Sequence, residues 1–154
     1  MKNSSAIIEE ALRLITTGEA NCVAVHEDAI IYTACGRGVS PLLALCTDAP
    51  EKLRGAFVLD SVIGKAAAVI LILGGARRVY GKIMSTAARD YLAAHDIPAE
   101  YGSLAENITN RSGDGLCPME RSVLDIRDPA EGLARIMNTL SGIAGAVARS
   151  GERT

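Results

Sequence analysis

Between Gly55 and Tyr101 the sequence alternates short β-rich runs with two helix-like segments. The β-rich runs are residues 56–59, 79–84 and 97–101, and the helix-like segments are residues 63–73 and 85–95. The first helical segment is apolar on nearly every side and is followed by Gly74-Gly75, which is typical of a helix buried at the centre of a domain. Strands that alternate with helices pair in parallel through right-handed crossovers. The sequence therefore predicts an α/β fold with a largely parallel portion.

The segment before this region has a different pattern. Ser4 or Ser5 is suited to cap a helix whose apolar residues recur at helical spacing until Gly18. Residues 22–25 and 30–33 are then two β-rich runs joined by four residues. Two such runs with a short polar connection predict an antiparallel hairpin.

Two more helices are expected outside the central region. Ser40 is placed to cap a short helix that begins at Pro41. A long helix begins at Pro129, and one of its faces carries a stripe of apolar residues: Leu133, Ile136, Met137, Leu140, Ile143, Ala144 and Val147. Gly142 and Gly145 would let this helix approach the core or a second subunit closely.

The size and composition of the chain limit its class. A chain of 154 residues that is 49% hydrophobic forms one compact domain, which we expect to span residues 1–148, with a frayed tail at 149–154. Only 3% of the residues are aromatic, so the core should be aliphatic. The net charge of −2 and the lack of basic runs argue against a nucleic-acid or membrane-surface partner.

The sequence also predicts a compartment. No signal peptide is visible at the N-terminus, and the most apolar run, residues 66–73, is far shorter than a membrane-spanning helix. The four cysteines are irregularly spaced in a chain large enough to fold without disulfides. We therefore expect a soluble, cytoplasmic protein with reduced thiols.

The polar segment 110–120 carries a thiol, that of Cys117, at a predicted helix start. Pro118 suits the first helical position and Glu120 stands where the acid of a capping box would, so Cys117 is the expected cap. A thiol at a helix N-terminus faces unpaired N–H groups that favour the thiolate and raise its reactivity. The alternative is an ordinary glycine-rich loop followed by a buried, unreactive cysteine.

Two basic residues are candidates for contact with an anion. Lys65 follows Gly64 at the start of the apolar helix, but Leu59 and Ala66 replace the Gly and Ser or Thr of a phosphate-binding loop, so that motif is rejected. Lys65 must then meet an anion or extend its ammonium group to solvent. Arg37, between two glycines, either faces an anionic ligand or is a surface residue in a turn, and the second interpretation is favoured.

The sequence offers little for a metal site. Cys22 and His26 are separated by three residues, and no Cys-x-x-Cys pair is present. We therefore expect no structural zinc, and we assign no base role to His26 or His95.

Three segments together resemble a known prokaryotic family. Residues 37–42, residues 62–68 and above all the segment 110–120 are similar to the domain of unknown function 1893 family. The resemblance covers nearly the whole chain before the last helix. It implies a cytidine-deaminase-like fold, which is a three-layer α/β/α arrangement around a mixed sheet of about five strands.

The chain departs from true deaminases of that fold at the zinc site. In those enzymes a His-Ala-Glu signature opens one helix and a Pro-Cys-x-x-Cys signature opens the next, which supplies three zinc ligands and a proton-transferring Glu. The corresponding places here are residues 64–66 and 85–88, where ligands and Glu are absent. Zinc-dependent deamination is therefore not expected.

The resemblance still implies a pocket at the N-termini of these two helices. Lys65 would be its charge partner, and Ser85 and Thr86 would be hydroxyl donors. The loop expected to close over the pocket adds three residues, the last as a candidate nucleophile: Asn110, Arg111 and Cys117.

Two functions follow as hypotheses. The first is a zinc-less deaminase-like protein that binds a small anionic or nucleotide-like ligand, with no metal or cofactor and with Cys117 available for chemistry. The second is a non-catalytic homo-oligomeric interaction module, in which the helix from Pro129 packs against a second subunit. The polar loop favours the first hypothesis, because a pure scaffold does not require it.

Overall fold

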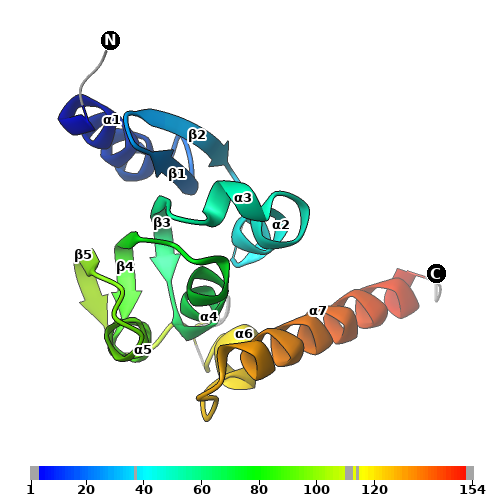
Figure 1. Cartoon of the computed structure of the whole chain (residues 1–154). Coiled ribbons are helices and arrows are strands. Elements are labelled where there is room, and N and C mark those ends of the chain that lie inside the picture. The colour runs from blue at the N-terminus through cyan, green and yellow to red at the C-terminus, as the bar shows by residue number, and fades with distance from the viewer. Residues whose placement is uncertain (1–3, 37, 110–112, 114, 152–154) are drawn as a thin grey trace.

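Five strands form one mixed sheet in the part of the chain that the structure, a computed structural model, describes: residues 4–36, 38–109, 113 and 115–151. The strand order is β2-β1-β3-β4-β5. Strand β1 runs antiparallel to both of its neighbours, whereas β3, β4 and β5 are parallel. Helices lie on both faces of the sheet, which gives three layers (Figure 1). The predicted mixed five-stranded α/β fold is confirmed at this level.

The first two strands form the predicted hairpin. Strand β1 is Cys22–His26 and β2 is Ala29–Ala34, and they pair antiparallel. Glu27 in the connecting turn has a φ of 51°, a left-handed conformation that short hairpin turns use. The other edge of β1 pairs with β3, where Cys22 lies opposite Asp60.

The alternation predicted for the centre of the chain is observed. Its elements are β3 (Phe57–Ile63), α4 (Lys65–Gly74), β4 (Arg78–Ser85), α5 (Thr86–Ala94) and β5 (Ala99–Ala105). The expected start of the helix at Ile63 is wrong, because Ile63 pairs with Met84 in the sheet. Gly64, in an extended conformation, separates the strand from the helix.

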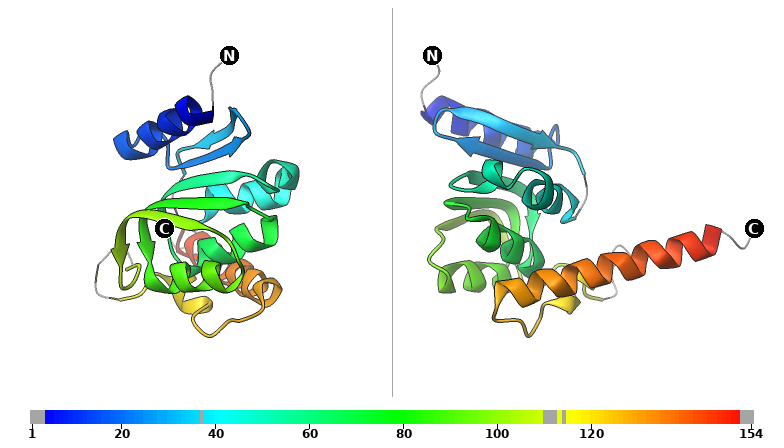
Figure 2. Two further views of the ribbon diagram at one scale, coloured as in Figure 1. Left: turned by 60° about the vertical axis from the view of Figure 1, so that its left-hand side comes forward. Right: turned by 45° about the vertical axis from the view of Figure 1, so that its right-hand side comes forward.

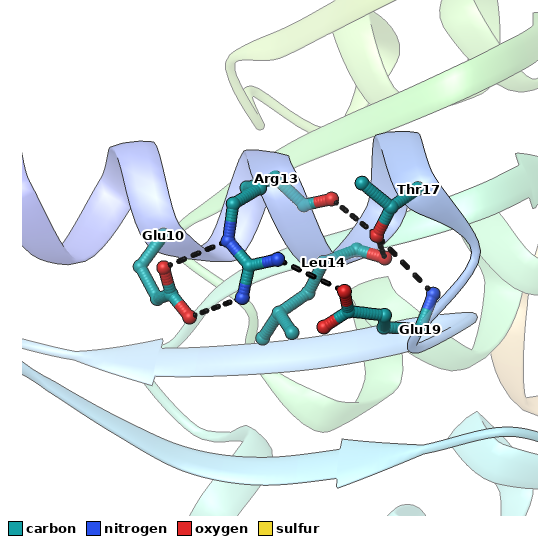
Figure 3. Close-up of polar contacts among 5 residues, drawn as sticks. All are labelled: Glu10, Arg13, Leu14, Thr17 and Glu19. Atoms are coloured by element: carbon teal, nitrogen blue, oxygen red, sulfur yellow. Dashed lines mark hydrogen bonds and ion pairs between the residues drawn. The ribbon is translucent and has the colours of Figure 1, made fainter.

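Helix α1 (Ser4–Thr17) covers one face of the sheet. Its buried residues Ile7, Ala11 and Ile15 pack in one cluster with residues of β1 and β3. On the exposed side, Arg13 bonds to Glu10 and to Glu19, as drawn in Figure 3. Exposed ion pairs of this kind add little stability, so apolar contact with the sheet holds the helix.

The larger core lies on the opposite face. Helix α4 is buried along most of its length, as its apolar sequence predicts, and it packs with α5 and α7. Residues of β1, β3 and β4 complete this cluster from the sheet side.

Two short helices connect the hairpin to β3. They are α2 (Ser40–Asp48) and α3 (Pro50–Leu53). The expectation that Ser40 caps the first of them is wrong. Val39 is the cap, Ser40 is the first helical residue, and no side-chain hydrogen bond is made at this end. Pro50 begins α3 rather than simply following α2.

The chain ends with α6 (Pro118–Ser122) and the long helix α7 (Pro129–Gly151). Helix α7 packs on α4 and α6 near its start and then extends away from the rest of the molecule (Figures 1 and 2). Close approach occurs at Gly132, where a Cβ would lie 3.0 Å from Cγ1 of Val69. At Gly142, by contrast, a Cβ would meet nothing within 4 Å.

The C-terminal end of α7 continues beyond the part that packs on the core. The tail expected to fray from Arg149 is helical through Gly151, and residues 152–154 lie outside the described residues. Gly145 is one of residues 143–151, whose packing is also outside the description. In the described part of the chain, no helix combines the length and the apolar character needed to cross a bilayer.

Candidate functional site

A cavity of about 230 Å³ lies where β3 ends and α4 begins. Four parts of the chain meet there: the residue before β1, the loop between β2 and α2, the end of β3 with the start of α4, and the segment around α6. The polar residues of its lining are Asn21, Asp60, Ser61, Cys117 and Glu120. The cavity therefore combines two carboxyl groups, a hydroxyl, an amide and a thiol.

Asp60 is the most deeply placed acid in the sheet, with only 4% of its surface exposed. The amide N–H of Val62 donates to its Oδ1 at 3.2 Å, and the Cys22 thiol and Ser61 also hydrogen bond to it. These bonds favour the ionised form, but burial dominates and raises the pKa of Asp60 from 3.8 to about 7. This carboxyl group can therefore donate or accept a proton near neutral pH.

Glu120 caps a helix other than its own. Its Oε2 accepts the amide N–H of Lys65 at 2.7 Å, and its Oε1 accepts that of Ala66 at 3.1 Å. These amides are the first two of α4, so the carboxylate occupies the positive end of that helix. Burial still raises the pKa of Glu120 above its ordinary value, against these two hydrogen bonds and the charge of Lys65. The capping box predicted within α6 is replaced by this long-range cap.

Cys117 occupies the position that the sequence predicts: it is the N-cap residue of α6, and Pro118 is the first residue of the helix. Its side chain makes no capping hydrogen bond, and the residue is partly buried where it lines the cavity. Its amide N–H donates to the carbonyl of Ile108 at 3.0 Å, and Thr109 forms a β-bridge with Leu116. The polar loop is thus closed at its base, beside the cavity.

The environment of Lys65 differs from the expected one. The side chain does not line the cavity. Its Nζ donates to the carbonyl oxygens of Leu124 at 3.0 Å and Ile126 at 2.8 Å, and it lies 5.0 Å from the centre of the Tyr91 ring. Burial lowers the pKa of Lys65. Lys65 therefore does not face the cavity. Its ammonium group binds the backbone that follows α6, where the charges of Asp125 and Glu120 favour its charged form.

The two hydroxyl residues expected in the pocket also lie elsewhere. Ser85 is buried and caps α5, since its Oγ accepts the amide N–H of Ala88 at 3.1 Å. The hydroxyl of Thr86 donates to the carbonyl of Glu106 at 3.2 Å. Neither residue lines the cavity, so the structure brings only Cys117 of the described candidates to it.

The remaining candidates, Arg37, Asn110 and Arg111, lie outside the described residues. Their neighbours along the chain are informative. Gly36 and Gly38, on either side of Arg37, both line the cavity. Ile108 lines it as well, two residues before Asn110.

The main residue that the sequence analysis missed is Asp60. The predicted strand stopped at Leu59, whereas β3 continues through Asp60 to Ile63. The signal was present, because an acidic residue inside an otherwise apolar strand carries a large desolvation cost. Such a residue is retained most often where it has a partner or a role. Asn21 and Ser61 reach the cavity only through the tertiary fold and had no local signal.

The described residues contain no group of three or more His, Cys, Asp or Glu side chains arranged to hold a metal ion. His95 bonds through Nδ1 to the carbonyl of Tyr91 at 3.0 Å. His26 has a buried Nε2 for which the described part of the chain supplies no partner, and it does not line the cavity.

Comparison with known proteins identifies the family. A crystal structure of a DUF1893 family protein from Thermotoga maritima is similar, with a TM-score of 0.76 and 24% sequence identity, over 89% of this chain and 90% of that chain. At this identity the likeness shows the fold alone. No curated protein matches the sequence. Residues 10–140 match the family described as Domain of unknown function (DUF1893). Since this match spans most of the molecule, the chain belongs to the DUF1893 family.

Proposed function

We propose that this protein binds a small molecule in the cavity between β3, α4 and α6 and exchanges a proton with it through Asp60. The observation that carries the proposal is the meeting of two buried carboxyl groups and a partly buried thiol in one cavity. Buried acids are costly, and a pKa near 7 is suited to proton transfer at neutral pH. Glu120 shapes the cavity, and the Cys117 thiol borders the bound molecule.

We also propose that the fold is cytidine-deaminase-like. The mixed sheet, in which an antiparallel hairpin precedes three parallel strands, supports this assignment, as does the cavity at the start of a central helix. The zinc-binding signatures of true deaminases are missing from the sequence at both helix starts. In their place, a carboxylate from a later segment, Glu120, reaches the first of these helices.

The size of the cavity limits the ligand. Pockets for drug-sized molecules enclose roughly 300–1,000 Å³, so a cavity of about 230 Å³ accepts a smaller molecule. Of the expected anionic or nucleotide-like ligands, a molecule the size of a nucleobase fits this volume better than a whole nucleotide.

A labelling experiment tests the proposal, because one cysteine reports on the cavity and two others provide internal references. Cys117 borders the cavity, Cys35 is exposed and Cys22 is buried. We expect iodoacetamide to label Cys35 and Cys117 in the folded protein and Cys22 only after unfolding. A ligand of the cavity should then slow the labelling of Cys117 alone, as measured by peptide mass spectrometry.

Two results would contradict the proposed site. If small-molecule fragments that bind the protein never protect Cys117, while Cys35 labels at its normal rate, the cavity is not the binding site. If Cys117 labels only together with Cys22, the thiol is part of the core and the proposed site is wrong.

The unpaired thiols support a proposed cytoplasmic location. All four cysteines, Cys22, Cys35, Cys46 and Cys117, are free in the structure. Free thiols are typical of proteins that work in a reducing compartment.

A second candidate function is self-association through α7. The helix extends well beyond the sheet and its covering helices (Figure 2). Met137, on the apolar stripe of the sequence, is 45% exposed. A projecting helix whose apolar stripe continues past the body of the protein is suited to packing against the same helix of a second copy.

A further inference from the structure

Two of the five described polar residues that line the cavity are acidic. Asp60 and Glu120 contribute carboxyl groups, and Asn21 and Ser61 contribute one amide and one hydroxyl. None of the described residues in the lining is Lys, Arg or His. Lys65 offsets part of the Glu120 charge from outside the lining. Two carboxyl groups in a small cavity still favour a positively charged ligand, because the surroundings screen their charge less than water does.

The helix start that would hold an anion is already occupied. The N-terminus of a helix binds anions through its free amide N–H groups. In α4 the first two of these groups donate to Glu120. A phosphate or carboxylate ligand at this end would have to displace a buried carboxylate that makes both bonds.

The cation at the first position of this helix, Lys65, is directed elsewhere. The ammonium group of Lys65 bonds to the carbonyls of Leu124 and Ile126, on the side of Tyr91 rather than in the cavity lining. Both features that favoured an anionic ligand, the helix start and Lys65, are therefore used within the protein.

We infer that the cavity takes a small planar cation that presents N–H groups, of the amidinium or guanidinium class. This inference rests on the proposed function and names the chemical class of its ligand. Planar N–H donors match carboxylates in two parallel hydrogen bonds, and these charge-assisted bonds are stronger than neutral ones. The ligand would bond to Asp60, while Glu120 keeps its bonds to α4 and adds negative charge.

The test compares two probes of nearly the same shape. Benzamidine carries a cationic amidinium group, and benzamide replaces it by a neutral amide. At about pH 8, where Asp60 with a pKa of about 7 is ionised, we expect benzamidine to bind about tenfold more tightly than benzamide. Protection of Cys117 from iodoacetamide gives both affinities and locates the binding, with inorganic phosphate as the anionic probe.

Asp60→Asn is the matched variant, because it keeps the shape and removes the charge. It should abolish the preference for benzamidine while Cys117 still labels at the rate seen in the folded wild type. Asp96→Asn, at an exposed acid outside the cavity lining, should leave the preference intact.

Each contrary outcome has a distinct meaning. Equal protection by benzamide and benzamidine, or protection by phosphate alone, would overturn the inference and leave the cavity as a binding site. A preference for benzamidine that persists in Asp60→Asn would also overturn it. If fragments that bind the protein never protect Cys117, the proposed function itself fails.

Discussion

Asp60 shows how one residue links the stability of this protein to pH. Its carboxyl group lies in the middle of a buried strand, opposite Cys22. Below about pH 4 it is protonated in the folded and the unfolded chain alike. Between pH 4 and 7 the unfolded chain releases the proton and the folded chain retains it, since burial raises its pKa from 3.8 to about 7. The contribution of Asp60 to the free energy of unfolding therefore falls as pH rises through this window.

Asp60→Asn should remove this dependence. As pH rises from about 5 to about 8, the wild type should lose about 2–3 kcal/mol of stability that the variant keeps. Urea unfolding of both proteins across this range measures the difference. Asp96→Asn controls for the loss of an acid at an exposed position. If wild type and Asp60→Asn have the same slope, Asp60 titrates in its ordinary range.

At the scale of the residue, sequence and structure agree best where a role depends on local backbone. Cys117 holds the cap position of α6, as its spacing predicts. The hydrogen-bond partners of Lys65 and Glu120 were harder to predict, because they lie 54 to 61 residues away in the sequence. Local pattern indicates that such residues sit at a helix end, but not which helix or which carbonyl they bind.

At the scale of the element, the start of α4 depends on a carboxylate from α6. Gly64 makes the contact feasible, because a Cβ at this position would overlap the Glu120 carboxylate. Its φ of −99° suits any residue, so the reason for glycine is space rather than backbone conformation. The cap therefore requires both a glycine before α4 and an acid in α6.

A double-mutant cycle tests this dependence. Glu120→Ala should cost about 3 kcal/mol, because it leaves two buried amides without a partner. Gly64→Ala should destabilise wild type, by displacing the carboxylate, but should cost at least about 1 kcal/mol less in the Glu120→Ala background. Urea unfolding of the four proteins gives the coupling.

The local cap of α5 provides the comparison. Ser85→Ala should cost about 1 kcal/mol and show no coupling to Gly64→Ala. Additive effects of Gly64→Ala and Glu120→Ala would mean that glycine is required at position 64 for another reason.

The elements themselves were largely predictable, because apolar periodicity and helix-ending residues decide where they lie. The errors fall at ends where a tertiary contact overrides the pattern. Strand β3 extends to Ile63, since sheet pairing with β4 outweighs the helical appearance of the apolar run. At α2, Val39 packs against the core and takes the cap position that Ser40 was expected to hold.

At the scale of the whole molecule, α7 has two parts. The first part belongs to the core, since Ile136 is fully buried and Gly132 lies against Val69. The later part extends away from the body. Removing the entire helix would therefore unfold the core as well as test assembly.

A truncation after Gly142 separates these effects. We expect the full chain to be a dimer by light scattering, and the shortened chain to be a folded monomer whose melting temperature depends less on protein concentration. Met137→Glu, at a half-exposed position on the same helix, should weaken the dimer without shortening the chain. An unchanged mass for both variants would exclude α7 as the interface.

The order of the sheet was less accessible to sequence analysis than its elements. Alternating strands and helices predict the parallel half, because right-handed crossovers place β3, β4 and β5 side by side. That β1 rather than β2 adjoins β3 depends on long-range pairing of β1 with β3 and on the packing of α1 against both strands, for which local pattern carries no signal. A pocket at this helix start was expected only from the family resemblance. Its acidic lining, which joins residues between Asn21 and Glu120, depends on the same long-range packing.

The long-range cap of α4 also imposes an order on synthesis. The amide groups of Lys65 and Ala66 leave the ribosome 54 to 55 residues before the carboxylate that binds them. Until Glu120 emerges, the nascent chain presents an uncapped helix start and an open-sided cavity. The last stage of translation therefore supplies the carboxylate that occupies the first two amide groups of this helix.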